Sequence, residues 1–323
     1  MKAAVLHQLG QAPKYDDFEE PIIINENQLL INVLAASVKN LDKARASGKH
    51  YASHTNLPEV VGVDGVGILE DGRRVYATGL TGMIAEKALI DKNKYTILPD
   101  EIDMVTAAAL PNALMGAALA LKYRAQMKTG DTVLINGATG VTGKVAIQIA
   151  RHYGAKKIIA TGRNADSLQL LKALGADEII SLQQEDKETI ELIKSIHDKN
   201  PIDIVIDYTW GHPAEMILTA LKGGGLHNIS HKVRFVTVGG MAGDLISLSS
   251  GILRSSAIEI LGSGLGSLSK EAMEMQFTET IPEMMQLAAS GKLIIDTETA
   301  ALKDIETAWQ KDIPAGKRLV ILI

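Results

Sequence analysis

The sequence predicts an α/β protein in which a doubly wound, six-stranded parallel sheet is inserted into a mostly β domain. Its 323 residues exceed the length at which a single hydrophobic core stops growing, so two domains are expected. From about residue 131, compact apolar strands alternate with segments of helical spacing, whereas the first 90 residues or so show only short extended runs. Strands that alternate with helices pair in parallel, because a crossover helix is the short way back to the same sheet edge.

The N-terminal part is expected to be all β, with irregular loops. Short extended runs at 1–6, 28–33 and 73–76 are broken by Gly, Pro and Asn, which are typical of turns. The first run is too short to be the core of a signal peptide, and no apolar segment reaches the length of about 18 residues that a membrane span needs. We therefore expect a cytoplasmic protein that has no membrane partner.

Six strands and the intervening helices are expected in the second part. The strands lie at 132–136, 157–161, 178–182, 202–208, 234–239 and 257–262. Helices are expected from about 144 onward and at 165–174, 187–197 and 214–221. The tail carries a helix at 272–290 and a closing strand at 319–323. The predicted domains are thus 1–118 together with 263–323, and an inserted nucleotide domain at 119–262.

The composition is that of an ordinary globular protein and excludes several functions. Apolar residues make up 46% and charged residues 22%, so there is no compositional case for disorder. The net charge is -5 and Lys and Arg form no stripe, which argues against nucleic-acid binding. Cysteine is absent, so disulfides, thiolate nucleophiles and sulfur-ligated zinc sites are excluded.

A glycine-rich loop follows the 132–136 strand and opens the next helix. Glycines in this context let the backbone turn sharply, bring a pyrophosphate close to main-chain N–H groups and let the helix pack closely on the strand. The spacing lacks the first glycine of the usual pattern, and a tight turn without a ligand is the alternative. The predicted cofactor contacts are Ala138, Thr139, Gly140, Val141 and Gly143.

The end of the second strand, at Thr161-Gly162-Arg163, indicates which dinucleotide binds. An NAD site places an acid there, against the ribose 2′-hydroxyl, but Gly162 stands in this position. Without a carboxylate to repel it a 2′-phosphate can enter, and Arg163 offers a planar fork of donors suited to phosphate. The sequence therefore predicts NADPH and contacts from all three residues. A solvated surface arginine is the alternative.

Several short motifs along the chain carry a resemblance that covers essentially its whole length. They are Lys2-Ala3-Ala4-Val5, Ser37 to Asp42 with Gly48, Gly62 to Gly67, the glycine-rich loop, and Gly316-Lys317. Together they resemble the zinc-independent quinone oxidoreductase branch of the medium-chain dehydrogenase/reductase superfamily. The resemblance implies a Rossmann domain inserted in a GroES-like catalytic domain. It also implies NADPH-dependent hydride transfer to quinones, enones or related activated alkenes, and a homodimer with the edge strand 257–262 available for pairing.

The same resemblance implies that no catalytic metal is bound. In zinc-dependent members a Cys lies near residues 38–40 and a His-Glu pair follows the glycine at position 62, but here the pair is Val63-Asp64. The third ligand would fall within 111–115, where no Cys, His or carboxylate is present. Asp64 alone cannot form the three-ligand site of a catalytic zinc.

The candidate catalytic residues lie in the segment that the resemblance places beside the nicotinamide, and they are Lys39, Asn40 and Tyr51. Hydride transfer to a polarised C=C leaves an enolate, which must be stabilised and then protonated. We expect Lys39 to be the oxyanion partner, with Tyr51 or water supplying the proton. A solvated lysine and a core or lid aromatic are the alternatives. His50 and His54 flank Tyr51, but with no third ligand in view they are interpreted as surface histidines.

Two loops at the carboxyl edge of the sheet are also expected to line the cofactor, because doubly wound folds bind ligands there. They follow the strands at 202–208 and 234–239, and simple loop turning is the alternative. The predicted contacts are Tyr208, Thr209, Val238, Gly239 and Gly240, together with Lys317 of the Gly316-Lys317 motif.

Two other functions stay open at this point. The same hydride chemistry would serve a reductase of 2-enoyl thioesters or of aldehydes. A non-catalytic protein that binds NADPH as a sensor or structural element is the alternative from a different class, because fold and cofactor site do not establish turnover.

Overall fold

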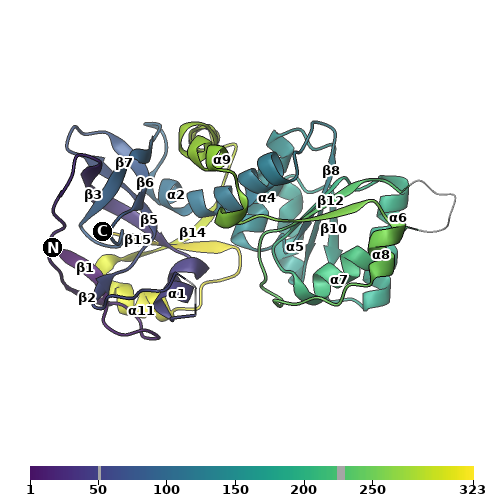
Figure 1. Ribbon diagram of the computed structural model, residues 1–323, viewed down its shortest axis with the longest axis horizontal. Coiled ribbons are helices and arrows are strands. Elements are labelled where there is room, and N and C mark those ends of the chain that lie inside the picture. Colours follow the sequence, from purple (N-terminus) through teal and green to yellow (C-terminus); the bar gives the residue numbers. More distant parts are fainter. Residues whose placement is uncertain (50–51, 224–229) are drawn as a thin grey trace. The chain divides into compact units, whose positions relative to one another are not determined.

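The computed structural model describes residues 1–49, 52–223 and 230–323, which form two compact units (Figure 1). Unit 1 comprises Met1–Asn112 and Phe277–Ile323, and unit 2 comprises Ala113–Gln276. Unit 2 is thus an insertion in the sequence of unit 1, and it extends further at both ends than the expected 119–262. Much of the added sequence is helical, in η1 (Met115–Arg124) and α9 (Lys270–Met275).

Unit 2 is built on a sheet of six strands in which every neighbouring pair is parallel. The strands are β8 (Thr132–Asn136), β9 (Lys157–Gly162), β10 (Glu178–Ser181), β11 (Ile204–Asp207), β12 (Val233–Thr237) and β13 (Ile258–Gly262). Their order β10-β9-β8-β11-β12-β13 confirms the predicted doubly wound sheet. The order reverses between β8 and β11, which is the point where such sheets bind ligands at their carboxyl ends.

Helices cover both faces of this sheet. The expected helices appear as α4 (Val141–His152), α5 (Ala165–Ala173), α6 (Asp186–Lys199) and α7 (Gly211–Ala220), and a short α8 (Ser250–Ser255) precedes β13. On one face, α6 and α7 share a buried apolar cluster with the strands, in which Leu134, Ile217 and Phe235 are all inaccessible to solvent. On the other face, α4 contacts β8 and β9 while α5 contacts β9 and β10.

The helix η1 (Met115–Arg124) was not expected from the sequence. Five consecutive residues of this π-helical segment, from Ala117 to Leu121, are buried. A helix that is apolar on all sides has no polar stripe, so the spacing of its apolar residues gives no helical signal. Gly116 lets η1 lie close to α4, since a Cβ on this glycine would stand 2.9 Å from Cγ2 of Thr142.

Unit 1 contains two sheets, which agrees with the mostly β domain that the sequence predicts. A three-stranded sheet has the order β2-β1-β4, and a six-stranded sheet has the order β14-β15-β3-β5-β6-β7. The strands are β1 (Lys2–Leu6), β2 (Lys14–Asp17), β3 (Gln28–Val38), β4 (Glu59–Val60), β5 (Asp64–Leu69), β6 (Arg74–Gly79), β7 (Lys87–Ile97), β14 (Asp296–Ala301) and β15 (Lys317–Leu322). Of these, β14 and β15 pair in parallel and the other neighbours in the six-stranded sheet are antiparallel.

The helices of unit 1 are short. They are α1 (Asn40–Ala46), α2 (Met104–Ala109), α10 (Ile281–Ala289) and α11 (Ile305–Gln310), with a single turn at η4 (Leu302–Asp304). Another single turn, α3 (Pro111–Leu114), spans the boundary between the two units, and η2 (Leu265–Ser267) lies in unit 2. The single helix expected at 272–290 is divided into α9, the π-helical η3 (Gln276–Thr280) and α10. The core of unit 1 joins its sheets to α11, and Leu6, Ile31 and Trp309 belong to it.

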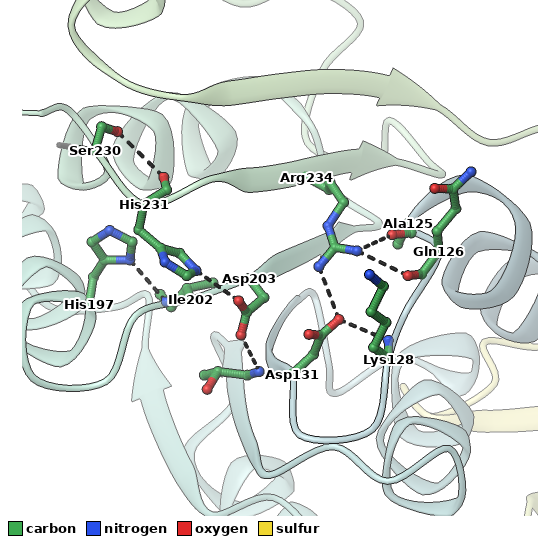
Figure 2. Close-up of polar contacts among 11 residues, drawn as sticks. Ala125, Gln126, Lys128, Asp131, His197, Ile202, Asp203, Ser230, His231 and Arg234 are labelled. Atoms are coloured by element: carbon green, nitrogen blue, oxygen red, sulfur yellow. Dashed lines mark hydrogen bonds and ion pairs between the residues drawn. The ribbon is translucent and has the colours of Figure 1, made fainter.

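Arg234 fastens the segment after η1 to the amino end of β12 (Figure 2). Its Nη1 donates to the carbonyls of Ala125 at 2.7 Å and Gln126 at 3.0 Å, and its Nη2 donates to Oδ2 of Asp131 at 3.0 Å. Gln126 has a φ of 49°, which is uncommon for a residue with a side chain. The guanidinium therefore stabilises a turn that leads from η1 into β8.

A neighbouring carboxylate, Asp203, performs the same task for the start of β8 (Figure 2). It accepts the N–H of Thr132 at 2.7 Å and lies 2.7 Å from Nε2 of His231.

Within the described residues, no helix is long and apolar enough to cross a lipid bilayer.

We expect Arg234→Met to lower the free energy of unfolding of unit 2 by more than about 2 kcal/mol, because three hydrogen bonds are lost and each hydrogen bond to a charged group contributes about 1.5 to 3 kcal/mol. Hydrogen exchange of the β12 amides under native conditions measures the change. The control is Lys232→Met, since among the described residues Lys232 forms only an exposed ion pair, with Glu259 at 2.8 Å. The loss of this pair should cost less than about 0.5 kcal/mol. Equal losses in the two variants would show that Arg234 does not hold the turn.

Candidate cofactor site and buried charge cluster

The carboxyl edge of the unit 2 sheet is held by a buried hydrogen-bond network around Asn136, the last residue of β8. Its Nδ2 donates to Oδ1 of Asp207 at 2.8 Å and to Oγ1 of Thr209 at 2.7 Å. Its Oδ1 accepts from the hydroxyl of Thr161 at 2.6 Å. Asn136, Thr161 and Asp207 are completely buried. The network joins the ends of β8, β9 and β11 and fixes the positions from which their loops start.

Asp207 also sets the conformation of the loop after β11. Its Oδ1 accepts the backbone N–H groups of Thr209 at 3.0 Å and Trp210 at 3.1 Å. Burial raises the pKa of Asp207, while these donors and Asn136 act to lower it. Trp210 has a φ of 51°, so this loop is in a conformation that non-glycine residues adopt rarely. The buried carboxylate is what stabilises it.

The glycine-rich loop turns at Gly137, one residue before the Ala138 that occupies the first position of the motif. Gly137 has a φ of 79°, and a Cβ on it would lie 2.7 Å from Cγ2 of Thr209. The N–H of Ala138 donates to the carbonyl of Thr161 at 2.8 Å. A Cβ on Gly143 would lie 2.5 Å from Cα of Ala138, so only glycine lets α4 pack this closely on the loop.

The N-terminus of α4 has the properties of a pyrophosphate site. Its N-cap residue, Gly140, supplies no side-chain cap to the first turn, so the backbone N–H groups there depend on another acceptor. A Cβ on Gly140 would meet nothing of the protein closer than 3.6 Å. Unlike Gly137 and Gly143, it has no steric reason within the protein to be glycine. The twelve-residue helix and the open space at its start fit the phosphates of a dinucleotide.

At the end of β9, Gly162 packs against the glycine-rich loop. A Cβ on Gly162 would lie 2.6 Å from Cγ2 of Thr139, so this glycine has a packing role besides the one expected from cofactor choice. Arg163 is exposed and makes no hydrogen bond or ion pair within the described ranges. The next residue, Asn164, caps α5 by accepting the N–H of Ser167 at 2.8 Å. Arg163 is thus available to a phosphate at the edge of the sheet.

The two loops expected to line the cofactor start from the same edge. The Tyr208 side chain is buried, and its hydroxyl donates to the carbonyl of Gly116 at 3.0 Å, so only its backbone is available to a ligand. Burial also raises the pKa of Tyr208. Val238 and Gly239 both direct their N–H groups to the carbonyl of Asp207, at 2.7 and 3.3 Å. Gly240 is exposed.

In unit 1, Lys39 is buried within a cluster of charged side chains. It is 1% exposed, which excludes the solvated lysine considered from the sequence. Its ammonium lies 2.5 Å from Oδ1 of Asp64 and 3.2 Å from Oδ2 of Asp42, and it donates to the carbonyl of Ser37 at 2.9 Å. Burial would lower the pKa of Lys39, but Asp42 and Asp64 raise it above its ordinary value.

The two carboxylates of this cluster are themselves held by other groups. Oδ2 of Asp64 accepts the hydroxyl of Tyr76 at 3.0 Å, and burial together with Asp64 raises the pKa of Tyr76. Asp42 accepts the N–H of Lys39 at 2.8 Å and the N–H of Val63 at 3.0 Å. Asp42 therefore fixes the start of α1 and the residue that leads into β5.

The other predicted site residues of unit 1 are exposed or lie outside the described residues. Asn40 is the exposed first residue of α1, and Lys317 is the exposed first residue of β15. Tyr51 and His50 lie outside the described residues. His54 is buried, not on the surface, and its Nδ1 lies 2.7 Å from Oε2 of Glu59. The roles assigned to Lys39, Asn40, Tyr51 and the cofactor loops stay predictions.

Several residues of these sites were not singled out from the sequence. Asn136 and Asp207 end strands that are mostly apolar, and a polar residue at the carboxyl end of a buried strand is a signal that could have found them. Tyr76 and Arg318 lie in strands of unit 1, where a polar group among buried neighbours is a similar signal. Their partners are distant in the sequence, so only the structure shows the contacts.

Comparison with known proteins places these features in a family. The profile of a family described as "Zinc-binding dehydrogenase" matches residues 141–290. Three curated relatives are a "Probable NADPH-dependent quinone reductase" of Emericella nidulans, a chloroplastic "NADPH-dependent alkenal/one oxidoreductase" of Arabidopsis thaliana and a "Quinone oxidoreductase" of Sus scrofa. The first is 26% identical, with 96% of each chain covered. The second is 34% identical over 57% of this chain and 50% of the relative. The third is 32% identical over 67% of this chain and 66% of the relative.

A solved structure extends the likeness to the full length. The quinone oxidoreductase of Thermus thermophilus, which has also been determined in complex with NADPH, is 27% identical with a TM-score of 0.81, and each chain is covered completely. Fold, glycine-rich loop and relatives agree: the chain belongs to the medium-chain dehydrogenase/reductase superfamily, in its quinone oxidoreductase-like branch.

Proposed function

We propose that this protein is an NADPH-dependent oxidoreductase that transfers hydride to quinones and enones. The observation that carries the proposal is the edge of unit 2, where the uncapped start of α4 lies beside a glycine and an exposed arginine at the end of β9. The names of the relatives support it, since two specify NADPH and all three specify quinones or alkenals and enones as substrates.

The cofactor would be held by groups of unit 2. Backbone N–H groups at the start of α4, next to Thr139, Gly140 and Val141, face the pyrophosphate, and Arg163 binds the 2′-phosphate. The loops after β11 and β12 supply backbone contacts, and Lys317 is a further proposed cofactor contact. When bound, NADPH supplies a hydride. Asn40 and Tyr51 are proposed to contact the substrate, with Tyr51 or water as proton donor.

The chemistry needs no catalytic zinc in this proposal, although the matching family profile is named for zinc. Of the carboxylate oxygens of Asp64, one is held by Lys39 and the other by Tyr76, so a metal would have to displace both. The Lys39 ammonium already provides a positive charge at that place. In the described ranges, no three His, Cys, Asp or Glu side chains converge on one point.

We also propose a cytoplasmic homodimer. The edge of the unit 2 sheet supports the second part of this proposal, because β13 has a neighbouring strand on one side only in the described part of the chain. Its apolar residues Ile258, Ile260 and Leu261 are partly exposed. An unpaired strand of this kind is suited to continuing the sheet into a second copy.

NADPH oxidation with a panel of quinones, enones, 2-enoyl thioesters and aldehydes tests the function. The enzyme is dialysed against a strong chelator first, and we expect turnover of quinones or enones to survive. Turnover of thioesters or aldehydes alone would favour those substrates. Tight NADPH binding without turnover of any compound would favour a non-catalytic protein, and activity restored by zinc alone would contradict the metal-independent mechanism.

Cofactor choice is expected to depend on Arg163. A charge-assisted contact to an exposed phosphate contributes about 1.5 to 3 kcal/mol, so Arg163→Ala should weaken NADPH binding about 10- to 100-fold and leave NADH binding nearly unchanged. Fluorescence titration of both cofactors gives the dissociation constants. The control is Arg254→Ala, an exposed arginine of α8 in the same unit, for which both constants should stay unchanged. If Arg163→Ala keeps its preference for NADPH, another group selects the cofactor.

We propose that Lys39 acts mainly by positioning Asp64 and Asp42. Removing one partner of a buried ion pair costs about 3 to 5 kcal/mol, so Lys39→Met should be strongly destabilised. The double variant Lys39→Met with Asp64→Asn removes both charges and should recover most of the stability and of kcat. Urea unfolding measures the stability of each variant, and steady-state kinetics measure its kcat. If stability recovers while kcat stays low, Lys39 is instead the oxyanion partner expected from the sequence.

A further inference from the structure

Arg318, the second residue of β15, carries a buried guanidinium whose donors are largely unused within the described residues. The residue is only 9% exposed. Its Nη2 makes a long contact of 3.5 Å with Oδ1 of Asn112, and its Nε has no hydrogen-bond partner in the described part of the chain. A guanidinium has five N–H donors, and burying unsatisfied donors costs free energy. A hydrogen-bond acceptor placed here would therefore be strongly bound.

The sheet brings Arg318 to the charge cluster of Lys39. In the antiparallel pairing of β15 with β3, Leu319 lies opposite Val38, so Arg318 and Lys39 follow as the next residue on each chain. Asp64 and Asp42 are near enough to oppose the lowering of the Arg318 pKa by burial. Among the described residues, however, no carboxylate is within ion-pair distance of Arg318.

Two other cations of unit 1, Lys39 and Arg74, use most of their donors within the described residues. Lys39 has Asp64, Asp42 and Ser37 around its ammonium. Arg74, whose Nε is also without a partner among the described residues, uses Nη1 and Nη2 to bind the carbonyls of Asp100, Pro99 and Ile102. Arg74 thus fastens a loop, whereas Arg318 is left with its donors nearly unused.

The charges of the cluster indicate what kind of acceptor fits. Lys39 and Arg318 are positive and Asp42 and Asp64 are negative, so the four groups sum to zero. A carboxylate or phosphate would add an uncompensated charge to this buried set. A neutral oxygen supplies the missing hydrogen bonds without that cost, and it can gain negative charge during a reaction because the guanidinium is close.

We propose that Arg318 is a catalytic residue, whose guanidinium binds the carbonyl oxygen of the substrate and stabilises the negative charge that develops there. This inference rests on the proposed function. The hydride adds to the β-carbon of an enone, the electron pair of the C=C bond moves toward the carbonyl, and its oxygen becomes an enolate oxygen held by Arg318. A proton delivered to the α-carbon then gives the saturated ketone.

The first test is Arg318→Met. We expect kcat for an enone to fall about 100- to 1,000-fold, as for the loss of one oxyanion donor elsewhere, with the dissociation constant of NADPH unchanged. The matched control is Arg74→Met, which removes a structural arginine from the same unit and should lower stability but not kcat. If Arg318→Met keeps kcat within about threefold of wild type, or loses NADPH affinity in parallel, the assignment is wrong.

A second test does not depend on turnover. Isotope-edited infrared spectroscopy of a bound saturated ketone, labelled with ¹³C at the carbonyl, reports hydrogen bonding to its oxygen. We expect a shift of the C=O band to lower wavenumber in the wild type and in Arg74→Met, and none in Arg318→Met. If Arg318→Met does not fold, Arg318→Lys retains the balance of charge and should show a smaller shift and an intermediate kcat. A full wild-type shift and kcat in Arg318→Lys and Arg318→Gln alike would overturn the proposal.

The two tests separate the proposal from the function on which it rests. A wild-type enzyme that reduces no quinone or enone, but shows a carbonyl shift that depends on Arg318, would contradict the proposed function and support the oxygen site. Turnover of enones with a carbonyl band that is indifferent to Arg318 would contradict the site and support the function.

Discussion

Unit 1 depends on one buried ion pair, between Lys39 and Asp64. Lys39 is the residue at which β3 gives way to α1, and Asp64 is the first residue of β5, so the pair fixes a junction of strand, helix and strand. Placing these charges away from water is costly, and that cost is offset only if both partners keep their hydrogen bonds. Asp42, Tyr76 and Ser37 provide them. The arrangement consequently tolerates little displacement of any of its members.

Unit 2 holds its edge with a network of mostly neutral side chains. The network of Asn136, Thr161 and Thr209 contains a single carboxylate, Asp207, whose oxygens accept from both side chains and backbone. A single carboxylate whose oxygens are filled by hydrogen-bond donors is less costly to bury than a cluster of four charged groups, which suits an edge that has to present backbone N–H groups to a ligand. The two units therefore hold their functional edges rigid by different means, one by charge balance and one by satisfied hydrogen bonds.

The nucleotide-binding fold could be predicted from the sequence because its signals are local. The strands of unit 2 are apolar runs between helices with a clear spacing, and β8 was expected with the boundaries that the structure has. The buried η1 carries no such periodicity and was missed. The environment of Lys39 was also beyond the sequence, since its partner Asp64 is 25 residues away and a lysine is exposed in most proteins. Arg318 joins the same cluster from the far end of the chain.

The contact between Gly162 and Thr139 has a consequence for how such a protein could evolve. An acid at position 162 would favour NADH, yet its Cβ would enter space that the Thr139 methyl already fills. A lineage that changes cofactor therefore has to make room at position 139, either by a rotation of the Thr139 side chain or by a smaller residue there. The two positions form an epistatic pair, in which the effect of an acid at position 162 depends on the side chain at position 139.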